Sequence, residues 1–308
     1  MDTVLNPLEV ISIEDFFPES VFDSDTQKFS KWVIEENIIR ASPELKVKEN
    51  LEPGVYIIDV HRDYGIYCKK IKISTDELFI FKSSVISELI EEISTFWEKR
   101  DLYKENKLVH KRGVLLFGYP GTGKTSIISL LEEQIVKNNG VIFKVTGPKN
   151  LYYYTTFIKD YFRKIQPDTP IITILEDINE YLDISAELLD LLDGANHIDH
   201  NVIIATTNDT TEIDEVFLRP SRIDLLIEIP LPCEEVRREF LLNKNVPKED
   251  LEELINKTKE FSLADLKELY ISRYILGYNL EESLLKLKKE VVKKNYLNKG
   301  RKKSTLGI

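Results

Sequence analysis

The stretch from Gly118 to Thr125, which reads Gly-Tyr-Pro-Gly-Thr-Gly-Lys-Thr, constrains the fold of this chain more than any other. The apolar run Val114–Phe117 precedes it, and a segment that suits a helix, Ser126–Glu133, follows it. Glycines allow such a loop to curl, so that backbone N–H groups and the positive end of the next helix face phosphate oxygens. The spacing G-x-x-x-x-G-K-S/T is typical of loops that hold the phosphates of a nucleoside triphosphate. The sequence therefore predicts a strand, a phosphate-binding loop and a helix, in that order.

Two side chains of this loop have expected chemical roles. Lys124 can reach the β- and γ-phosphates, and the hydroxyl of Thr125 is placed to bind Mg²⁺. The alternative is a glycine-rich turn formed by chance, which the complete motif between a strand and a helix disfavours. The residues expected to contact the nucleotide are Gly118, Tyr119, Pro120, Gly121, Thr122, Gly123, Lys124, Thr125 and Ser126.

Length and composition bound the class of protein. The 308 residues suffice for about two domains, and 42% hydrophobic with 31% charged residues is ordinary for a globular protein. A net charge of −11 disfavours a uniformly basic surface for nucleic acid, although a local basic patch stays compatible with it. Cys68 and Cys233 lie far apart and suggest reduced thiols. Because no signal peptide or long apolar run is visible, we expect a cytoplasmic protein without membrane insertion.

Short apolar runs alternate with helix-compatible segments from residue 113 to residue 232. This rhythm predicts an α/β fold in which a five-stranded parallel sheet lies between helices. The expected strands are Val114–Phe117, Val141–Val145, Ile171–Leu175, Val202–Ala205 and Leu225–Ile229. Charged segments with helical spacing follow, at 234–243, 248–261, 263–276 and 280–296, and predict an all-helical region.

The residues before this core predict a small β-rich or α+β domain. We expect a short amphipathic helix over Phe29–Arg40, then strands near Val55–Val60, Ile66–Cys68 and Ile71–Ile73. A helix with an apolar face is expected over Ser83–Tyr103. The expected domains are an N-terminal domain that recognises a partner or substrate (1–82), the α/β core (83–232), a helical domain (233–297) and a flexible basic tail (298–308).

Polar residues follow two of the expected strands. Glu176, directly after Ile171–Leu175, would hold Mg²⁺ through its water shell, and Asp177 would orient or deprotonate an attacking water. An acidic cap on the next helix is the alternative. Asn208 ends the run Val202–Asn208 and could reach the γ-phosphate, unless it only forms a turn before Asp209.

Two arginines, Arg219 and Arg222, flank Pro220 and Ser221. At the rim of a subunit they could project into a neighbour's phosphate site, where guanidinium stabilises the charge of a transferring phosphoryl group. A surface salt-bridge pair is the alternative.

In this order the motifs resemble the AAA ATPase family, part of the AAA+ superfamily. The resemblance covers about residues 83 to 290 and rests on GYPGTGKT, ILEDI, LLDLLDG, ATTN, LRPSRID and FSLADL. It implies a helical lid on the α/β core, bound ATP and Mg²⁺, and a ring that is usually hexameric. By position it makes Lys124 and Thr125 Walker A residues, Glu176 and Asp177 Walker B residues, Asn208 sensor 1, and Arg219 and Arg222 arginine fingers acting in trans. Ala264 falls where such lids touch the nucleotide.

The sequence departs from the family pattern in three ways. Walker B reads Glu-Asp instead of Asp-Glu, which resembles the Bcs1-like branch and suggests modest turnover. Ser221 replaces the usual glycine between the arginines. Proteins of that branch normally carry an N-terminal membrane helix, and none is visible in this sequence.

The segment Thr146–Thr155 lies where AAA rings place their central-pore loop. Aligned on Gly147 and Pro148, Tyr154 takes the aromatic position that grips a polypeptide, within the run Tyr152, Tyr153 and Tyr154. The alternative is that these tyrosines pack on the helix below.

The resemblance implies an ATP-hydrolysing homo-oligomeric ring, with ATP at subunit interfaces, that remodels or translocates a protein. Its protein substrate or adaptor would bind the N-terminal domain. Three alternatives remain: a nucleic-acid motor or loader, which the acidic charge disfavours; a slow scaffold gated by nucleotide, which the Glu-Asp order allows; and a monomeric phosphotransferase, which would not need Arg219 and Arg222.

Overall fold

The computed structural model describes residues 29–35, 38–43, 48–62, 65–73, 84–193 and 198–287, and the chain divides into two compact units at residues 49 and 50. The smaller unit contains an antiparallel hairpin of β1 (Phe29–Glu35) and β2 (Ile38–Pro43), in which Ile34 pairs with Ile39. The helix predicted over Phe29–Arg40 is therefore wrong. The β-branched residues that crowd this segment favour strands, and that preference outweighs the helical spacing of its apolar positions.

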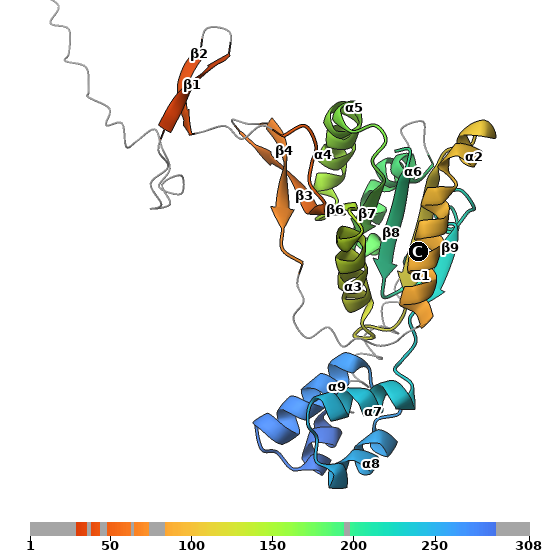
Figure 1. The fold of residues 1–308 in the computed structure, drawn as a ribbon. Helices are drawn as coiled ribbons and strands as arrows, with labels where there is room; N and C mark the ends of the chain where they lie inside the picture. Colours follow the sequence, from red (N-terminus) through yellow and green to blue (C-terminus); the bar gives the residue numbers. More distant parts are fainter. Residues whose placement is uncertain are drawn as a thin grey trace, which may run out of the picture. The chain divides into compact units, whose positions relative to one another are not determined.

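The larger unit is built on a seven-stranded sheet (Figure 1) in the order β4-β3-β6-β7-β8-β5-β9. All of these strands run parallel except β4, which pairs antiparallel with β3 at one edge. The strands are β3 (Gly54–His61), β4 (Gly65–Ile71), β5 (Lys111–Phe117), β6 (Val141–Val145), β7 (Ile171–Leu175), β8 (Asn201–Thr207) and β9 (Leu225–Glu228). The five predicted parallel strands are confirmed.

Strands β3 and β4 belong to this sheet, so the expected N-terminal domain over residues 1–82 is wrong for them. β3 pairs in parallel with β6, with Val55 opposite Ile142. Val55 is buried on one face of the sheet and Ile58 on the other. A strand that is buried on both faces needs a layer on each side, which only the large core supplies.

Helices cover both faces of the sheet (Figure 1). On one face lie α1 (Ser84–Glu98) and α3 (Lys124–Lys137), and on the other α4 (Lys149–Phe157) and α6 (Ser185–Leu192). Because side chains alternate along β5, Leu115 packs with the second layer while Val114 and Leu116 pack with the first. The remaining short helical elements are α2 (Arg100–Glu105), a π-helical turn at Ile158–Phe162, α5 (Arg163–Ile165), and 3-10 turns at Ile178–Ile184 and Thr210–Glu212.

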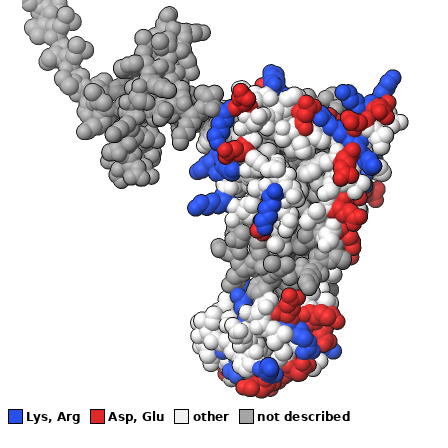
Figure 2. All heavy atoms as spheres, in the orientation of Figure 1, with Lys and Arg blue, Asp and Glu red and all other residues white. Residues whose placement is uncertain are grey.

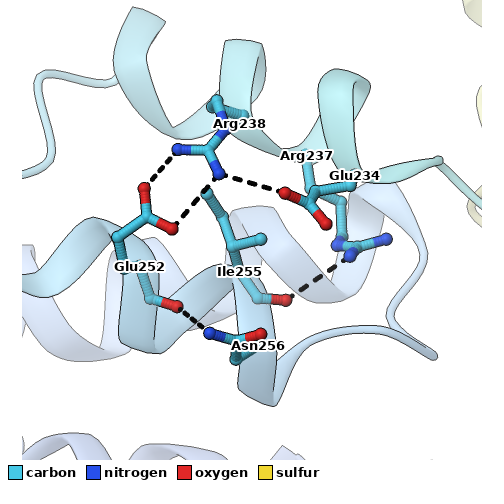
Figure 3. Close-up of polar contacts among 6 residues, drawn as sticks. All are labelled: Glu234, Arg237, Arg238, Glu252, Ile255 and Asn256. Carbon is cyan, nitrogen blue, oxygen red and sulfur yellow. Dashed lines mark hydrogen bonds and ion pairs between the residues drawn. The ribbon is translucent and has the colours of Figure 1, made fainter.

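The C-terminal helices form a small bundle with its own apolar core. They are α7 (Glu234–Asn243), α8 (Lys248–Lys257), α9 (Leu263–Tyr270), which continues as a π-helical turn over Ile271–Ile275, and a helix over residues 280–287. Arg238 on α7 joins its own helix to α8 through ion pairs with Glu234 and Glu252 (Figure 3). The buried Arg237 beside it donates hydrogen bonds to the carbonyl oxygens of Pro232 and Ile255. The predicted helical lid is thus present as far as residue 287, and the expected tail at 298–308 lies outside the described residues.

Across the described part of the chain, no helix combines the length and the hydropathy that a membrane crossing requires.

Candidate active site

Three of the predicted site segments meet at one edge of the sheet. β5, β7 and β8 run parallel, and their register places Phe117 opposite Thr207 and Leu175 opposite Ala205. The residues that directly follow these strands are therefore neighbours at the carboxyl edge, where ligands bind in open parallel sheets. The structure brings together the glycine-rich loop, the acidic pair after β7 and Asn208.

The loop has the curled backbone that its glycines allow. Gly121 and Gly123 have φ angles of 81° and 101°, in the left-handed region that other residues avoid. A Cβ on Gly121 would lie 2.7 Å from the Cβ of Ala264 and 2.8 Å from Oγ of Ser262. The N–H of Ala264 donates to the carbonyl oxygen of Gly121 across 3.2 Å. The first turn of α9 thus forms one wall of the loop, and the contact of Ala264 with a nucleotide stays a prediction.

The charge of Lys124 is held inside the loop. Its ammonium donates to the carbonyl oxygens of Gly118 (2.7 Å) and Tyr119 (3.0 Å), and the residue is 7% exposed. Burial lowers the pKa of Lys124, while the nearby carboxylate of Asp177 acts in the opposite direction. Thr125, the next residue on α3, is exposed. A cation and a free hydroxyl therefore stand at the mouth of the loop, as binding a metal–triphosphate requires.

Asp177 has an unusual backbone. Its φ and ψ angles are 56° and 65°, and its N–H donates to Oγ1 of Thr206 across 3.0 Å. Aspartate is one of the few residues with a side chain that tolerate this left-handed conformation, and strained backbone of this kind often occurs at functional sites. This conformation turns the backbone directly after Glu176, where the 3-10 turn Ile178–Ile184 begins.

Glu176 makes an ion pair that the sequence did not reveal. Its Oε1 lies 2.8 Å from Nζ of Lys144 on β6. The only sequence signal for Lys144 was a single charged residue within the otherwise apolar strand Val-Ile-Phe-Lys-Val. The proximity of Lys144 to Glu176 can be recognised only once β6 and β7 are known to pair.

Asn208 is exposed and follows β8 directly. The turn behind it is held by side-chain bonds: the hydroxyl of Thr207 bonds Oδ1 of Asn179, whose Nδ2 donates to the carbonyl oxygen of Asp209 across 3.0 Å. The 3-10 turn after Asp177 and the turn after β8 are thereby joined, which fixes the position of Asn208 relative to the acidic pair.

The arginine pair lies at the opposite end of β5 from the loop. The N–H of Gly113 donates to Asp224 across 2.8 Å, and the ammonium of Lys111 donates to the carbonyl oxygen of Ser221. Because Gly113 lies five residue steps of about 3.3 Å before Gly118, roughly 16 Å separates this segment from Gly118.

The two arginines differ in their surroundings. Arg222 bonds Asp193 through Nε (3.2 Å) and the carbonyl oxygen of Val216 through Nη1 (2.7 Å). Arg219 is exposed, and its guanidinium has no hydrogen bond or ion pair within the residues that the structure describes; only its backbone carbonyl oxygen accepts one, from the N–H of Arg222 (3.1 Å). Of the two predicted fingers, Arg219 is the one whose guanidinium is available to another molecule.

Tyr154, expected at the gripping position, is wrongly assigned. It is 1% exposed on the inner face of α4, and its hydroxyl bonds Oγ1 of Thr173 on β7. Leu151, Tyr154 and Ile158 follow helical spacing and face the sheet together. Tyr153 is partly buried against the same core, whereas Tyr152 is 66% exposed on the first turn.

These features fit a nucleoside triphosphate with Mg²⁺: left-handed glycines, a loop wall that a Cβ would fill, and a lysine, a hydroxyl and two carboxylates at one sheet edge. Together with the parallel sheet they define a P-loop nucleotide-binding domain with a helical lid. Residues 114–231 match the model of the ATPase family associated with various cellular activities (AAA), so this part of the chain is similar to an AAA domain.

Curated relatives support the same assignment. The chain is 32% identical over 203 residues to the ATPase family gene 2 protein of Schizosaccharomyces pombe and 31% identical over 219 residues to the proteasome-activating nucleotidase of Aeropyrum pernix. It is 27% identical over 225 residues to 26S proteasome regulatory subunit 6A of Saccharomyces cerevisiae. These matches cover 59%, 63% and 65% of this chain but 25%, 52% and 51% of the relatives. The chain therefore spans about half, or less, of the length of these relatives.

Proposed function

We propose that the protein hydrolyses ATP in a homo-oligomeric ring, with each ATP bound between two subunits and Arg219 supplied by the neighbour. The position of Arg219 carries this proposal. Its guanidinium is exposed and has no hydrogen bond or ion pair within the described residues, and its segment meets β5 at Gly113, roughly 16 Å from the phosphate loop of its own chain. A guanidinium at this distance from its own loop does not reach its own nucleotide, which supports a role at the site of another subunit.

The residues at the sheet edge divide the chemistry among them. The backbone of the loop and Lys124 bind the β- and γ-phosphates, and Thr125 with Glu176 would hold Mg²⁺. Bound Mg²⁺ would neutralise charge on the phosphates. Asp177 orients the attacking water or takes its proton, and Asn208 positions the same water against the γ-phosphate.

The substrate that we propose is a protein. The names of two relatives refer to the proteasome, and Tyr152 offers an exposed aromatic side chain in the segment that pore loops occupy in AAA rings. On the face drawn in Figure 2, basic side chains gather over the β3–β4 edge and acidic ones over α1, so that neither sign covers the face. A surface of this kind gives less support to a nucleic-acid motor. Both cysteines are free, which supports a reducing compartment such as the cytoplasm.

ATPase rate against protein concentration, with light scattering in ATP, tests the proposal. We expect the specific activity to rise with concentration in the wild type and to be lost in Asp177→Asn and Arg219→Ala, while Asp177→Asn still assembles. Arg238→Ala is the control, because it removes an arginine whose ion pairs, with Glu234 and Glu252, lie within the helical lid. Constant activity in a dilute monomer that is indifferent to Arg219→Ala would rule out shared sites. ATP-dependent assembly without turnover would favour a nucleotide-gated scaffold.

A further inference from the structure

A chain of charges joins the phosphate-loop helix to the acidic pair. Nζ of Lys144 on β6 lies 3.1 Å from Oε1 of Glu132 on α3 and 2.8 Å from Oε1 of Glu176 after β7. We call these three residues the Glu132–Lys144–Glu176 bridge. It spans three elements that meet beneath the loop.

The bridge runs from the interior to the site. The side chain of Glu132 is 3% exposed, that of Lys144 20% and that of Glu176 38%. Burial raises the pKa of Glu132, and the charge of Lys144 opposes this effect. Burial alone would lower the pKa of Lys144, but its hydrogen bond to Glu176 and the charges of both carboxylates raise it overall. Lys144 is therefore a cation held between two acids, one of them at the proposed metal site.

The geometry leaves Glu176 able to serve a metal ion while it is held. The ion pair uses Oε1, so the second carboxylate oxygen is not part of that contact. A fixed carboxylate with one oxygen committed to a lysine is oriented by it, and the lysine's charge also acts on any cation bound nearby.

We propose that Lys144 is a positioning residue which acts on Mg²⁺ through Glu176, and that the net charge of the bridge sets the Mg²⁺ affinity of the nucleotide site. This inference rests on the proposed role of Glu176 in holding Mg²⁺. The wild-type bridge carries one net negative charge. Lys144→Met removes the one positive charge of the bridge, Glu132→Gln removes one of its negative charges, and the double variant removes one charge of each sign.

These charges predict an order of metal affinity. At about 6 Å from a divalent cation, one unit charge changes the affinity roughly tenfold even in a medium as polar as water. We therefore expect the half-saturating Mg²⁺ concentration to fall about tenfold in Lys144→Met and to rise by a similar factor in Glu132→Gln. The double variant and Lys144→Arg should stay near the wild type.

The measurement is a Mg²⁺ titration of the binding of a fluorescent ADP analogue to the full chain, which needs no turnover and no ring. Shifts of opposite sign for the two single variants, cancelled in the double variant, would support the inference. A general loss of packing cannot produce that pattern, because it moves both variants in one direction. Equal values in all variants, or a rise in Lys144→Met, would overturn it. Glu132→Gln removes a buried charge and should fold even if Lys144→Met does not, so its expected rise tests the inference alone.

Glu176→Gln separates this inference from the function on which it rests. If Glu176→Gln leaves the Mg²⁺ dependence of nucleotide binding unchanged, the metal role of Glu176 fails and the inference fails with it. If Glu176→Gln weakens the dependence while the Lys144 and Glu132 variants do not move it, only the inference fails.

Discussion

Acid should destabilise the fold through a buried pair of histidines at the amino edge of the sheet. Nδ1 of His110 lies 2.8 Å from Nδ1 of His200, and Nε2 of His110 lies 2.8 Å from the carbonyl oxygen of Phe96. The carbonyl can only accept, so His110 donates from Nε2 and, when neutral, accepts at Nδ1 from His200. A further proton on Nδ1 of His110 would place two donors face to face. The hydrogen bond between the two rings therefore requires a neutral His110, and a charge on His200 is opposed by its burial and by the cations around it.

The magnitude follows from the pKa of His200. Burial lowers this pKa from 6.5 to about 4. The charges of Arg100, His110 and Arg163 act in the same direction as burial, and the charge of Asp199 opposes it. The unfolded chain then binds the proton first as the pH falls, so stability is complete above pH 6.5 and is lost progressively toward pH 4. Between pH 8 and pH 5 this one group should remove about 2 kcal/mol from the free energy of unfolding.

Urea unfolding at pH 8 and at pH 5, in the wild type and in His200→Asn, measures this difference. His200 has a φ angle of 55°, which asparagine tolerates, and the asparagine amide can still donate to His110 without titrating. We expect the variant to lose less stability than the wild type by about 2 kcal/mol over this range. The same loss in both proteins would refute the assignment of acid sensitivity to His200.

Two further predictions concern the loop and α4. Gly121→Ala should weaken nucleotide binding at least tenfold in a fluorescence titration, because the new Cβ meets Ala264 and the left-handed backbone is strained. The control is Gly65→Ala, which should leave nucleotide binding unchanged, because Gly65 is also left-handed but has open space around it. Tyr154→Phe should lower the free energy of unfolding by about 1 kcal/mol, because it removes the buried hydrogen bond between the Tyr154 hydroxyl and Thr173 and leaves Thr173 with its bond to Asn201 alone. Tyr152→Ala should leave stability unchanged and reduce only the processing of a protein substrate, and a change in its free energy of unfolding would contradict the exposed position of Tyr152.

Local patterns in the sequence were enough to predict the strands and helices around the loop. β5, the glycine loop and α3 follow one another directly, and the spacing of apolar residues defined α7, α8 and α9. The face of α4 was also visible in principle, because Leu151, Tyr154 and Ile158 have helical spacing, but alignment on Gly147 and Pro148 pointed to Tyr154 instead. For Tyr154, the helical spacing of apolar residues was better evidence of burial than the alignment with pore loops was of exposure.

Features that depend on pairing between distant segments could not be predicted. β3 pairs with the parallel strands of the core through β6, nearly ninety residues later in the chain, and nothing within Gly54–His61 indicates that partner. The same holds for Lys144, whose role depends on its distance from Glu176, and for Arg222, which differs from Arg219 because its guanidinium bonds Asp193 and the carbonyl oxygen of Val216. The chemistry of each residue was readable in the sequence, but its partner was not.

The most direct test of sites shared between subunits is to mix two inactive variants. Asp177→Asn keeps Arg219 and lacks the acidic group, whereas Arg219→Ala keeps Asp177 and lacks the finger. In a randomly mixed ring about a quarter of the sites would combine an intact Asp177 with an intact Arg219 from the neighbour. We predict that each variant alone is inactive and that an equal mixture recovers roughly this fraction of the wild-type ATPase rate. A mixture that stays as inactive as its components, although light scattering shows that they assemble together, would contradict the proposal that neighbouring subunits complete each other's sites.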